Sequence, residues 1–313
     1  MMKNSWHSLE IVFVLIVILT SYVLGQNISG DEWLERPVDD KTFLAYLDFF
    51  SYDTTLSFEE TVLGIDETEG LNREHVTFQS TSDIFVTSYL YYPDKHDFKS
   101  HPALILLHGG TGSGKDAPYN VVYAQQLARG GWTVFAVDLL HFGERKSGLL
   151  TKFTENEKHE NLYNKPSEYL AWIIQNVKDI GRAFDFLVAK KGIDKDHIGL
   201  FGLSRGAQVS IIAAGVIQKF NAVVLYHGGH FDALEKDHSG AACPANYISR
   251  ISPSPLLMVN GIYDNDYNKD FSVEPLLLLA KEPKKIIWTD GGHMFSSEED
   301  RAEIIKWLNK NLK

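Results

Sequence analysis

The sequence predicts an α/β fold: a doubly wound, mostly parallel sheet of eight strands with a helical extension before it. Three observations favour this class. Short apolar runs alternate with helical patterns from residue 74 onward. Several runs are apolar at every position, which is typical of parallel strands that are covered on both faces. The chain has 313 residues, 44% of them hydrophobic, which is enough for one large core.

The first element, residues 1–25, is predicted to be a secretory signal peptide. Lys3 precedes an unbroken apolar run at residues 11–19, and a bilayer-spanning helix needs about 20 apolar residues. Val23 and Gly25 occupy the −3 and −1 positions of a cleavage site. We therefore expect a secreted or periplasmic protein. The alternative is an uncleaved segment that anchors the protein, and only then is a membrane a partner.

The second element, residues 26–73, is predicted to be an N-terminal extension. Between residues 31 and 69 the sequence is acidic and rich in aromatic residues. Phe43, Leu44, Leu47 and Phe50 have the spacing of an amphipathic helix that packs on the main body.

The remainder, residues 74–313, is predicted to be one catalytic domain. The expected strands are residues 74–79, 86–92, 103–107, 133–137, 197–201, 222–226, 256–260 and 285–288. The expected helices are residues 119–129, 168–190, 205–218, 269–281 and 297–311. Because ligands of such sheets bind at the carboxyl ends of the strands, the loops after these strands are where we expect chemistry.

The strongest functional signal is the motif G-L-S-R-G at residues 202–206, between a predicted strand and a predicted helix. A sharp turn there lifts the Ser204 hydroxyl above the sheet, and the flanking glycines avoid collisions with neighbouring backbone. The motif therefore predicts a nucleophilic serine. A helix-capping serine in a glycine turn is the alternative interpretation.

A nucleophilic serine requires a histidine base oriented by a carboxylate. Asp264 and His293 follow the last two predicted strands, in the chain order Ser, Asp, His that accompanies this type of turn. We predict these three residues as the catalytic triad. Asp266 is a rival for the carboxylate, and Asp264 is preferred because it lies closer to the strand end.

Two backbone amides are expected to hold the oxyanion of the tetrahedral intermediate. One is the amide of Arg205, which follows the serine. The other belongs to Gly110 or Thr111, in the glycine-rich turn after the third predicted strand. The sequence does not distinguish these two donors.

The same turn also fits the first part of a phosphate-binding loop, G-x-x-x-x-G-K at residues 109–115. Asp116 stands where that loop requires Ser or Thr, and its carboxylate would repel phosphates. We therefore predict that Lys115 is an exposed loop residue or part of the cleft rim. Asp138, after the fourth strand, is interpreted as a structural carboxylate.

No cofactor or metal is predicted. A metal site from His227, His230 and Asp232 is conceivable, but these residues lack helical spacing, and a role in lining the pocket is preferred. Cys243 is the single cysteine and cannot form an internal disulfide. With 30 Lys and Arg against 41 Asp and Glu, the net charge of −11 argues against nucleic acid as a partner.

Together these motifs resemble the α/β-hydrolases, and among them the dienelactone hydrolase-like and acetyl xylan esterase-like group. The resemblance covers residues 74–313. Its motifs are H-G-G at 108–110, D-L-L-H-F-G-E-R at 138–145, G-L-S-R-G at 202–206, P-L-L-M-V-N-G-I-Y-D at 255–264 and G-G-H at 291–293. True dienelactone hydrolases use a cysteine nucleophile, so Ser204 favours ordinary ester hydrolysis instead.

The expected function is therefore hydrolysis of carboxylic esters with short acyl groups, through an acyl-enzyme on Ser204. If the protein is exported, acetylated or feruloylated carbohydrates are expected substrates by resemblance. An oligopeptidase-like serine peptidase and a non-catalytic binding module are the alternatives. The substrate-binding residues, the natural ester and the oligomeric state do not follow from the sequence.

Overall fold

The computed structural model describes residues 32–68, 70–93, 100–232, 234–236 and 238–313. The chain divides into two units, residues up to Pro37 and Val38–Lys313. In the first unit, the described part contains the short helix α2 (Glu32–Glu35). The predicted signal peptide, residues 1–25, lies outside the described residues. Across the described ranges, every helix is too short or too polar to cross a membrane.

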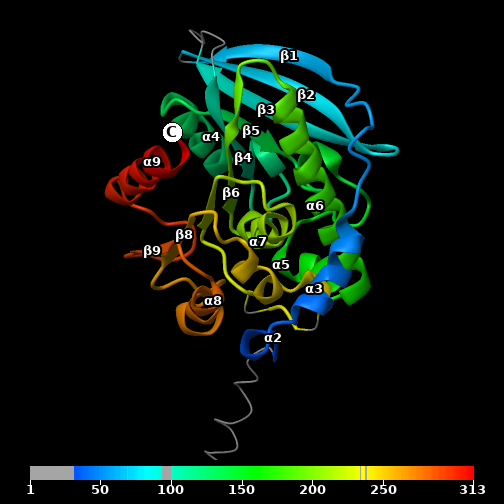
Figure 1. Cartoon of the computed structure of the whole chain (residues 1–313), viewed down its shortest axis with the longest axis vertical. Helices are drawn as coiled ribbons and strands as arrows, with labels where there is room; N and C mark the ends of the chain where they lie inside the picture. Colours follow the sequence, from blue (N-terminus) through cyan, green and yellow to red (C-terminus); the bar gives the residue numbers. More distant parts are fainter. Residues whose placement is uncertain (1–31, 69, 94–99, 233, 237) are drawn as a thin grey trace, which may run out of the picture. The chain divides into compact units, whose positions relative to one another are not determined.

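The second unit is built on one sheet, which has nine strands within the described residues (Figure 1). Their order across the sheet is β1-β2-β3-β5-β4-β6-β7-β8-β9. Neighbouring strands from β5 to β9 run parallel, whereas β1, β2 and β3 join antiparallel at one edge. The strands are β1 (Thr61–Thr68), β2 (Leu71–Thr81), β3 (Ile84–Pro93), β4 (His101–Leu107), β5 (Thr133–Val137), β6 (Ile193–Leu203), β7 (Ala222–Tyr226), β8 (Leu256–Gly261) and β9 (Lys284–Thr289).

The predicted fold class is confirmed, but the sheet has nine strands instead of eight. The additional strand, β1, lies in the segment that was expected to be a helical extension. All eight of its residues are exposed, and the pairing with β2 is irregular between Val62 and Gly64. A strand at the sheet edge that is covered on neither face carries no burial pattern, so apolar periodicity does not reveal it.

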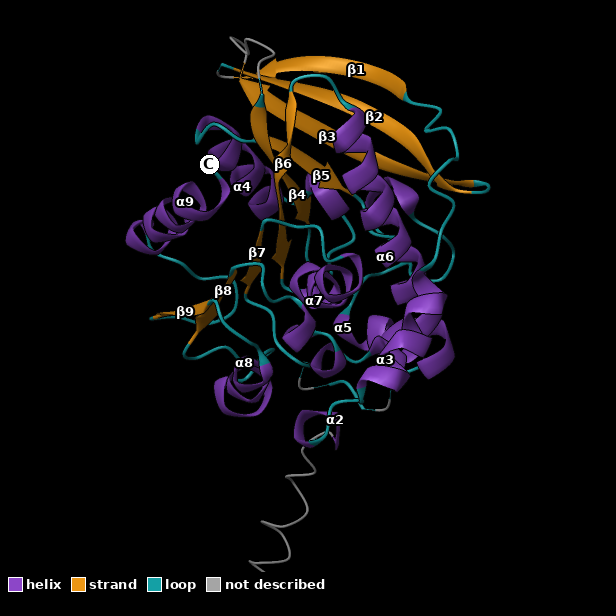
Figure 2. Ribbon diagram, in the orientation of Figure 1, coloured by secondary structure: helices purple, strands orange, loops and turns teal. Residues whose placement is uncertain are grey.

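Helices cover both faces of the sheet (Figure 2). One face packs with α4 and α9 around a core that includes Leu104 and Leu106 of β4. On the opposite face, Phe135 of β5 stacks on Phe186 of α6, with ring centroids 5.2 Å apart. Helix α7 packs against both α6 and the central strand β6. The helices are α3 (Asp40–Leu47), α4 (Pro118–Arg129), α5 (Glu155–Lys158), α6 (Pro166–Ala189), α7 (Arg205–Ile217), α8 (Glu274–Leu279) and α9 (Glu298–Leu312).

Two helix predictions need correction. The helix expected at residues 269–281 is a π-helical turn, Lys269–Val273, followed by the short α8, which has a proline in its first turn. Of the residues expected on the buried face of the N-terminal helix, Phe43 and Phe50 are buried but Leu44 is 62% exposed. Helix α3 ends at Leu47 and a 3-10 turn follows, so Phe50 of that turn completes the buried stripe.

Candidate active site

Ser204 lies in the sharp turn between β6 and α7. Its backbone φ of +51° falls in the left-handed region, which a serine adopts only when the surrounding structure holds it there. A Cβ atom on Gly206 would lie 2.5 Å from the carbonyl oxygen of His108, so only glycine allows α7 to approach the β4 loop this closely. The turn presents the Ser204 side chain at the carboxyl end of the sheet.

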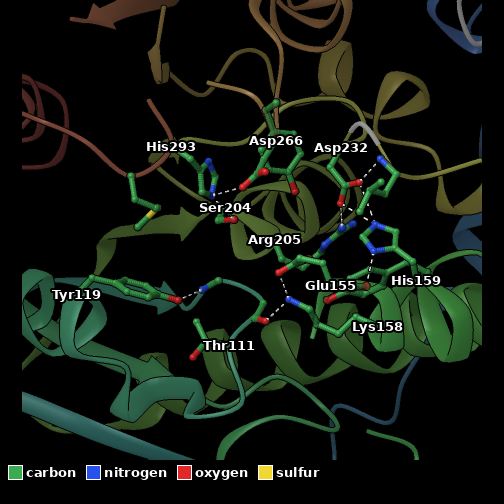
Figure 3. Close-up of a pocket in the computed structure, with 16 residues that line it drawn as sticks. Thr111, Tyr119, Glu155, Lys158, His159, Ser204, Arg205, Asp232, Asp266 and His293 are labelled. Carbon is green, nitrogen blue, oxygen red and sulfur yellow. Dashed lines mark hydrogen bonds and ion pairs between the residues drawn. The ribbon is translucent and has the colours of Figure 1, made fainter. Parts of the chain in front are cut away.

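The structure brings the predicted triad residues together, and Figure 3 shows two of them, Ser204 and His293. His293 Nε2 and Ser204 Oγ are 2.9 Å apart, and His293 Nδ1 lies 2.9 Å from Asp264 Oδ2. These residues follow β9, β6 and β8, three strands whose carboxyl ends meet at one edge of the sheet. Asp266, the rival carboxylate, is placed on the other side of the imidazole, with Oδ2 3.6 Å from Nε2.

The Asp264 carboxylate is buried and fully hydrogen-bonded. Its Oδ1 accepts the backbone amides of Asp266 and Tyr267, and its Oδ2 faces both His293 and His227. Burial by itself would raise the pKa of Asp264, but the hydrogen bonds from the two histidines outweigh it and hold the pKa well below its usual range. Asp264 is therefore ionised throughout the pH range in which His293 can act as a base.

His227, which the sequence predicted as a pocket-lining residue, belongs instead to this cluster behind the triad. Its Nδ1 lies 3.4 Å from Asp264 Oδ2, and its Nε2 lies 3.0 Å from the carbonyl oxygen of Phe295. The side chain is completely buried, and this burial lowers the pKa of His227. It joins the triad carboxylate to the loop that carries His293.

The two candidate amides in the β4 loop differ in their hydrogen bonds. The Thr111 amide donates to the carbonyl oxygen of Gly109 at 2.8 Å, and the Gly109 amide donates to Tyr119 Oη at 3.1 Å. Within the part of the chain that the structure describes, the Gly110 amide and the Arg205 amide donate to no acceptor. Gly110 also lies close to Arg205, since a Cβ atom on Gly110 would be 3.7 Å from the Arg205 Cβ. The geometry favours Gly110 as the second donor.

A pocket with a volume of about 220 Å³ opens beside Ser204. One wall comes from α5 and the π-helical turn that follows it, His159–Tyr163. The residues lining the pocket are Gly109, Gly110, Thr111, Tyr119, Glu155, Lys158, His159, Tyr163, Ser204, Arg205, Asp232, Leu234, Asp266, Tyr267, His293 and Met294. The lining combines charged side chains, such as Glu155 and Lys158, with apolar and aromatic ones, such as Met294 and Tyr267.

Arg205 holds the pocket wall to the start of α7. Its guanidinium contacts Asp232 at 2.6 Å and Glu235 at 2.5 Å, and it lies over the ring of Tyr163, 3.8 Å from the centroid. The sequence singled out Arg205 only for its backbone amide. Its side chain adds a second role, because it ties the loop after β7 to the π-helical turn.

The prediction that Lys115 is exposed is wrong. Its side chain is completely buried, with Nζ 2.9 Å from Asp138 Oδ2 and 4.5 Å from the centroid of the Tyr89 ring. Asp138 Oδ1 also accepts the Lys115 amide at 2.7 Å. A lysine bound in this way points away from any phosphate, so the loop does not form the phosphate-binding site. Asp138 is the structural carboxylate that the sequence suggested.

The two histidines of the loop after β7, His227 and His230, lie in different clusters. His227 faces Asp264, whereas Asp232 faces Arg205 and His159. His230 lies with His238 and Cys243 in a group whose candidate ligand atoms are within 4.8 Å of one another. Such a group has the donor types that zinc and copper accept. The three residues drawn together in the sequence as a metal site are therefore not one cluster.

Comparison with known proteins gives one family. The dienelactone hydrolase family model matches residues 86–303, which is more than half of the chain. The uncharacterized protein YfhR of Escherichia coli O157:H7 is 28% identical over 138 residues, covering 39% of this chain. The match spans about half of that relative, 47% of its length.

Solved structures with a similar fold include two acetyl xylan esterases. The enzyme from Paenibacillus sp. R4 is 13% identical, with a TM-score of 0.68 over 90% of this chain and 99% of its own. Acetyl xylan esterase 1 from Thermoanaerobacterium sp. JW/SL YS485 is 17% identical, with a TM-score of 0.69 over 89% of this chain and 97% of its own. A putative dienelactone hydrolase from Klebsiella pneumoniae is 16% identical, with a TM-score of 0.56 over 72% of this chain and 94% of its own. At these identities the similarity concerns the fold.

Proposed function

The chain belongs to the dienelactone hydrolase family and has an α/β-hydrolase fold, and from this premise we propose that it is a serine esterase for short acyl groups. One observation carries the proposal. Hydrogen bonds connect Ser204 Oγ, both ring nitrogens of His293 and the buried Asp264 carboxylate in an unbroken chain. This is the arrangement that turns a weakly acidic hydroxyl into a nucleophile.

In the proposed reaction, Ser204 Oγ attacks the ester carbonyl while His293 Nε2 takes the hydroxyl proton. Asp264 stabilises the resulting imidazolium through Nδ1. The negative charge that develops on the carbonyl oxygen is bound by the amides of Gly110 and Arg205, and the α7 N-terminus adds a favourable dipole. His293 then protonates the departing alcohol. Water, deprotonated by the same nitrogen, releases the acid from the acyl-enzyme.

The size of the pocket supports a short acyl group. Its volume of about 220 Å³ is below the several hundred Å³ of typical ligand pockets. Two proteins of similar fold are named acetyl xylan esterases, and we carry acetylated carbohydrates to this chain as its substrate class. We further propose that residues 1–25 direct export. N-terminal sequencing of the mature protein would then begin at Gln26.

The test compares hydrolysis of 4-nitrophenyl acetate, butyrate and octanoate by the protein lacking residues 1–25. We expect acetate to have the highest kcat/KM. Ser204→Ala should lower kcat on the order of 10⁶-fold, because the nucleophile is removed. Ser57→Ala, the same substitution at an exposed serine, should retain full activity. Acetate release from acetylated xylan then tests the carbohydrate class.

Folded protein without activity above the Ser204→Ala background on all three esters and on acetylated xylan would contradict the esterase proposal. A binding module with a hydrolase fold would then be the better interpretation. A preference for octanoate would contradict only the proposed specificity for short acyl groups and would leave the esterase proposal intact.

A further inference from the structure

We propose that Asp266 selects substrates by the charge of their alcohol group, favouring cationic or neutral leaving groups over anionic ones. This inference rests on the proposed esterase function and extends it from the acyl side of the ester to the alcohol side.

The first step is the position of the carboxylate. The Asp266 amide donates to Asp264 Oδ1 at 2.9 Å, and the turn formed in this way directs the Asp266 side chain toward His293. Its Oδ2 lies 3.6 Å from His293 Nε2, the same nitrogen that lies 2.9 Å from Ser204 Oγ (Figure 3). The carboxylate therefore flanks the atom that carries the proton during the reaction.

The second step follows from the chemistry. His293 Nε2 must protonate the oxygen of the leaving alcohol, so that oxygen has to come within hydrogen-bond distance of Nε2. Whatever is attached to the alcohol oxygen then lies beside Asp266. A hydroxyl or a cationic group there finds an acceptor, whereas an anionic group meets a like charge at short range.

The third step is the balance of charge around Ser204. The cations that line the pocket are already paired: Lys158 with Glu155 at 2.5 Å, and Arg205 with Asp232 at 2.6 Å. Within the described residues, no lysine or arginine lies within 4 Å of the Asp266 carboxylate, and its side chain is 60% exposed. The charge of Asp266 is therefore open to the substrate.

The experiment measures kcat/KM for three acetate esters of para-substituted phenols. The substituents are carboxylate, nitro and trimethylammonium, so the leaving groups are anionic, neutral and cationic. For each ester, the kcat/KM of the variant is divided by that of the wild-type protein. The intrinsic reactivity of the ester cancels in this ratio. The variants are Asp266→Asn and a matched control, Asp270→Asn, which removes the same charge at a side chain that is 67% exposed.

For Asp266→Asn we expect the ratio of kcat/KM for the cationic ester to that for the anionic ester to fall about tenfold, as a unit charge about 5 Å away in a partly solvated site implies. Asp270→Asn should leave this ratio within about twofold, because the Asp270 carboxylate is exposed to solvent and lies 3.9 Å from the Lys269 ammonium. In the wild-type protein the same ratio should shrink as sodium chloride is raised from 0.05 to 0.5 M.

An unchanged ratio in Asp266→Asn, or a wild-type ratio that does not respond to salt, would overturn the inference while leaving the esterase proposal intact, provided that the esters are hydrolysed. An equal fall in both variants would also overturn it, since it would indicate a general field effect. Absence of hydrolysis of all three esters above the Ser204→Ala background would overturn the esterase proposal and this inference with it.

Discussion

Asp264 illustrates at the scale of one residue how hydrogen bonds decide the state of a buried carboxyl group. Two backbone amides donate to its Oδ1, His293 Nδ1 donates to its Oδ2, and the His227 ring lies 3.4 Å from the same oxygen. They outweigh the cost of burial and keep the pKa of the group low. The carboxylate can therefore hold the Nδ1 proton of His293 and leave Nε2 unprotonated for Ser204.

We expect Asp264→Asn to lower kcat about 10⁴-fold with little change in KM. The asparagine carbonyl can still accept the two amides of its own turn, so the fold should persist. Its amide nitrogen, however, would face His293 Nδ1 and favour the tautomer with the proton on Nε2, where it cannot act as a base toward Ser204. Steady-state kinetics on 4-nitrophenyl acetate would measure the change, with circular dichroism to verify folding. A loss smaller than tenfold would show that Asp264 is not the orienting carboxylate.

At the scale of elements, the pocket wall is attached to the sheet by polar contacts. His159 begins the π-helical turn after α5, and its Nε2 lies 2.9 Å from Asp232 Oδ1, in the loop after β7. Asp232 also binds Arg205 at the start of α7. One carboxylate thus joins three elements that are far apart in the sequence, and the shape of the pocket depends on it.

This contact should depend on pH. Burial opposes the charged form of His159, but the hydrogen bond and the charge of Asp232 prevail and raise its pKa above the ordinary value. The same contact lowers the pKa of Asp232 to about 2, against the cost of burial. For a histidine with a raised pKa, the stabilisation is complete below about 6.5, the unfolded value, and is lost as pH rises through the folded value. Asp232 keeps its charge over that whole interval.

We therefore expect His159→Gln to lower the free energy of unfolding by about 1–3 kcal/mol at pH 5.5 and by less at pH 9. Urea denaturation of the variant and the wild-type protein at each pH would measure the difference. His197→Gln is a suitable control, because that histidine forms its ion pair at a side chain that is 43% exposed. Equal losses at both pH values would mean that the charge of His159 does not contribute.

At the scale of the whole molecule, residues 38–60, which precede β1, belong to the same unit as the sheet. The ring of Phe50 is 3% exposed and meets the ring of Tyr247 edge-on, with centroids 6.0 Å apart. The ring centroid of Phe43 lies 5.8 Å from that of the same tyrosine. These contacts join the beginning of the unit to the segment between β7 and β8, so we expect both to unfold in one transition.

Phe50→Ala should accordingly lower the free energy of unfolding by about 3–5 kcal/mol, as for other buried aromatic side chains. The neighbouring Phe49 is 45% exposed, and Phe49→Ala should change the free energy of unfolding by no more than about 0.5 kcal/mol. Chemical denaturation followed by tryptophan fluorescence would compare the two. If Phe50→Ala had as little effect as Phe49→Ala, the segment would not be part of the cooperative unit.

Most of the sheet and the chemically active loops could be predicted because their signals are local. A parallel strand covered on both faces is apolar at every position, and the turn around Ser204 needs its glycines within five consecutive residues. Asp264 and His293 could be placed because the carboxyl ends of parallel strands meet at one edge. Strand β1 could not be predicted, because an exposed edge strand has no apolar pattern.

The sequence by itself thus determined the fold class, the likeness to a family and the three residues proposed for catalysis. Only the tertiary structure decided that Gly110 and not Thr111 has a free amide, that Lys115 is buried against Asp138, and that Asp266 faces His293. It also supplied the pocket wall around His159. The physical reason is that hydrogen-bond partners and burial depend on residues that are distant in the chain, whereas periodicity and turn motifs depend only on neighbours.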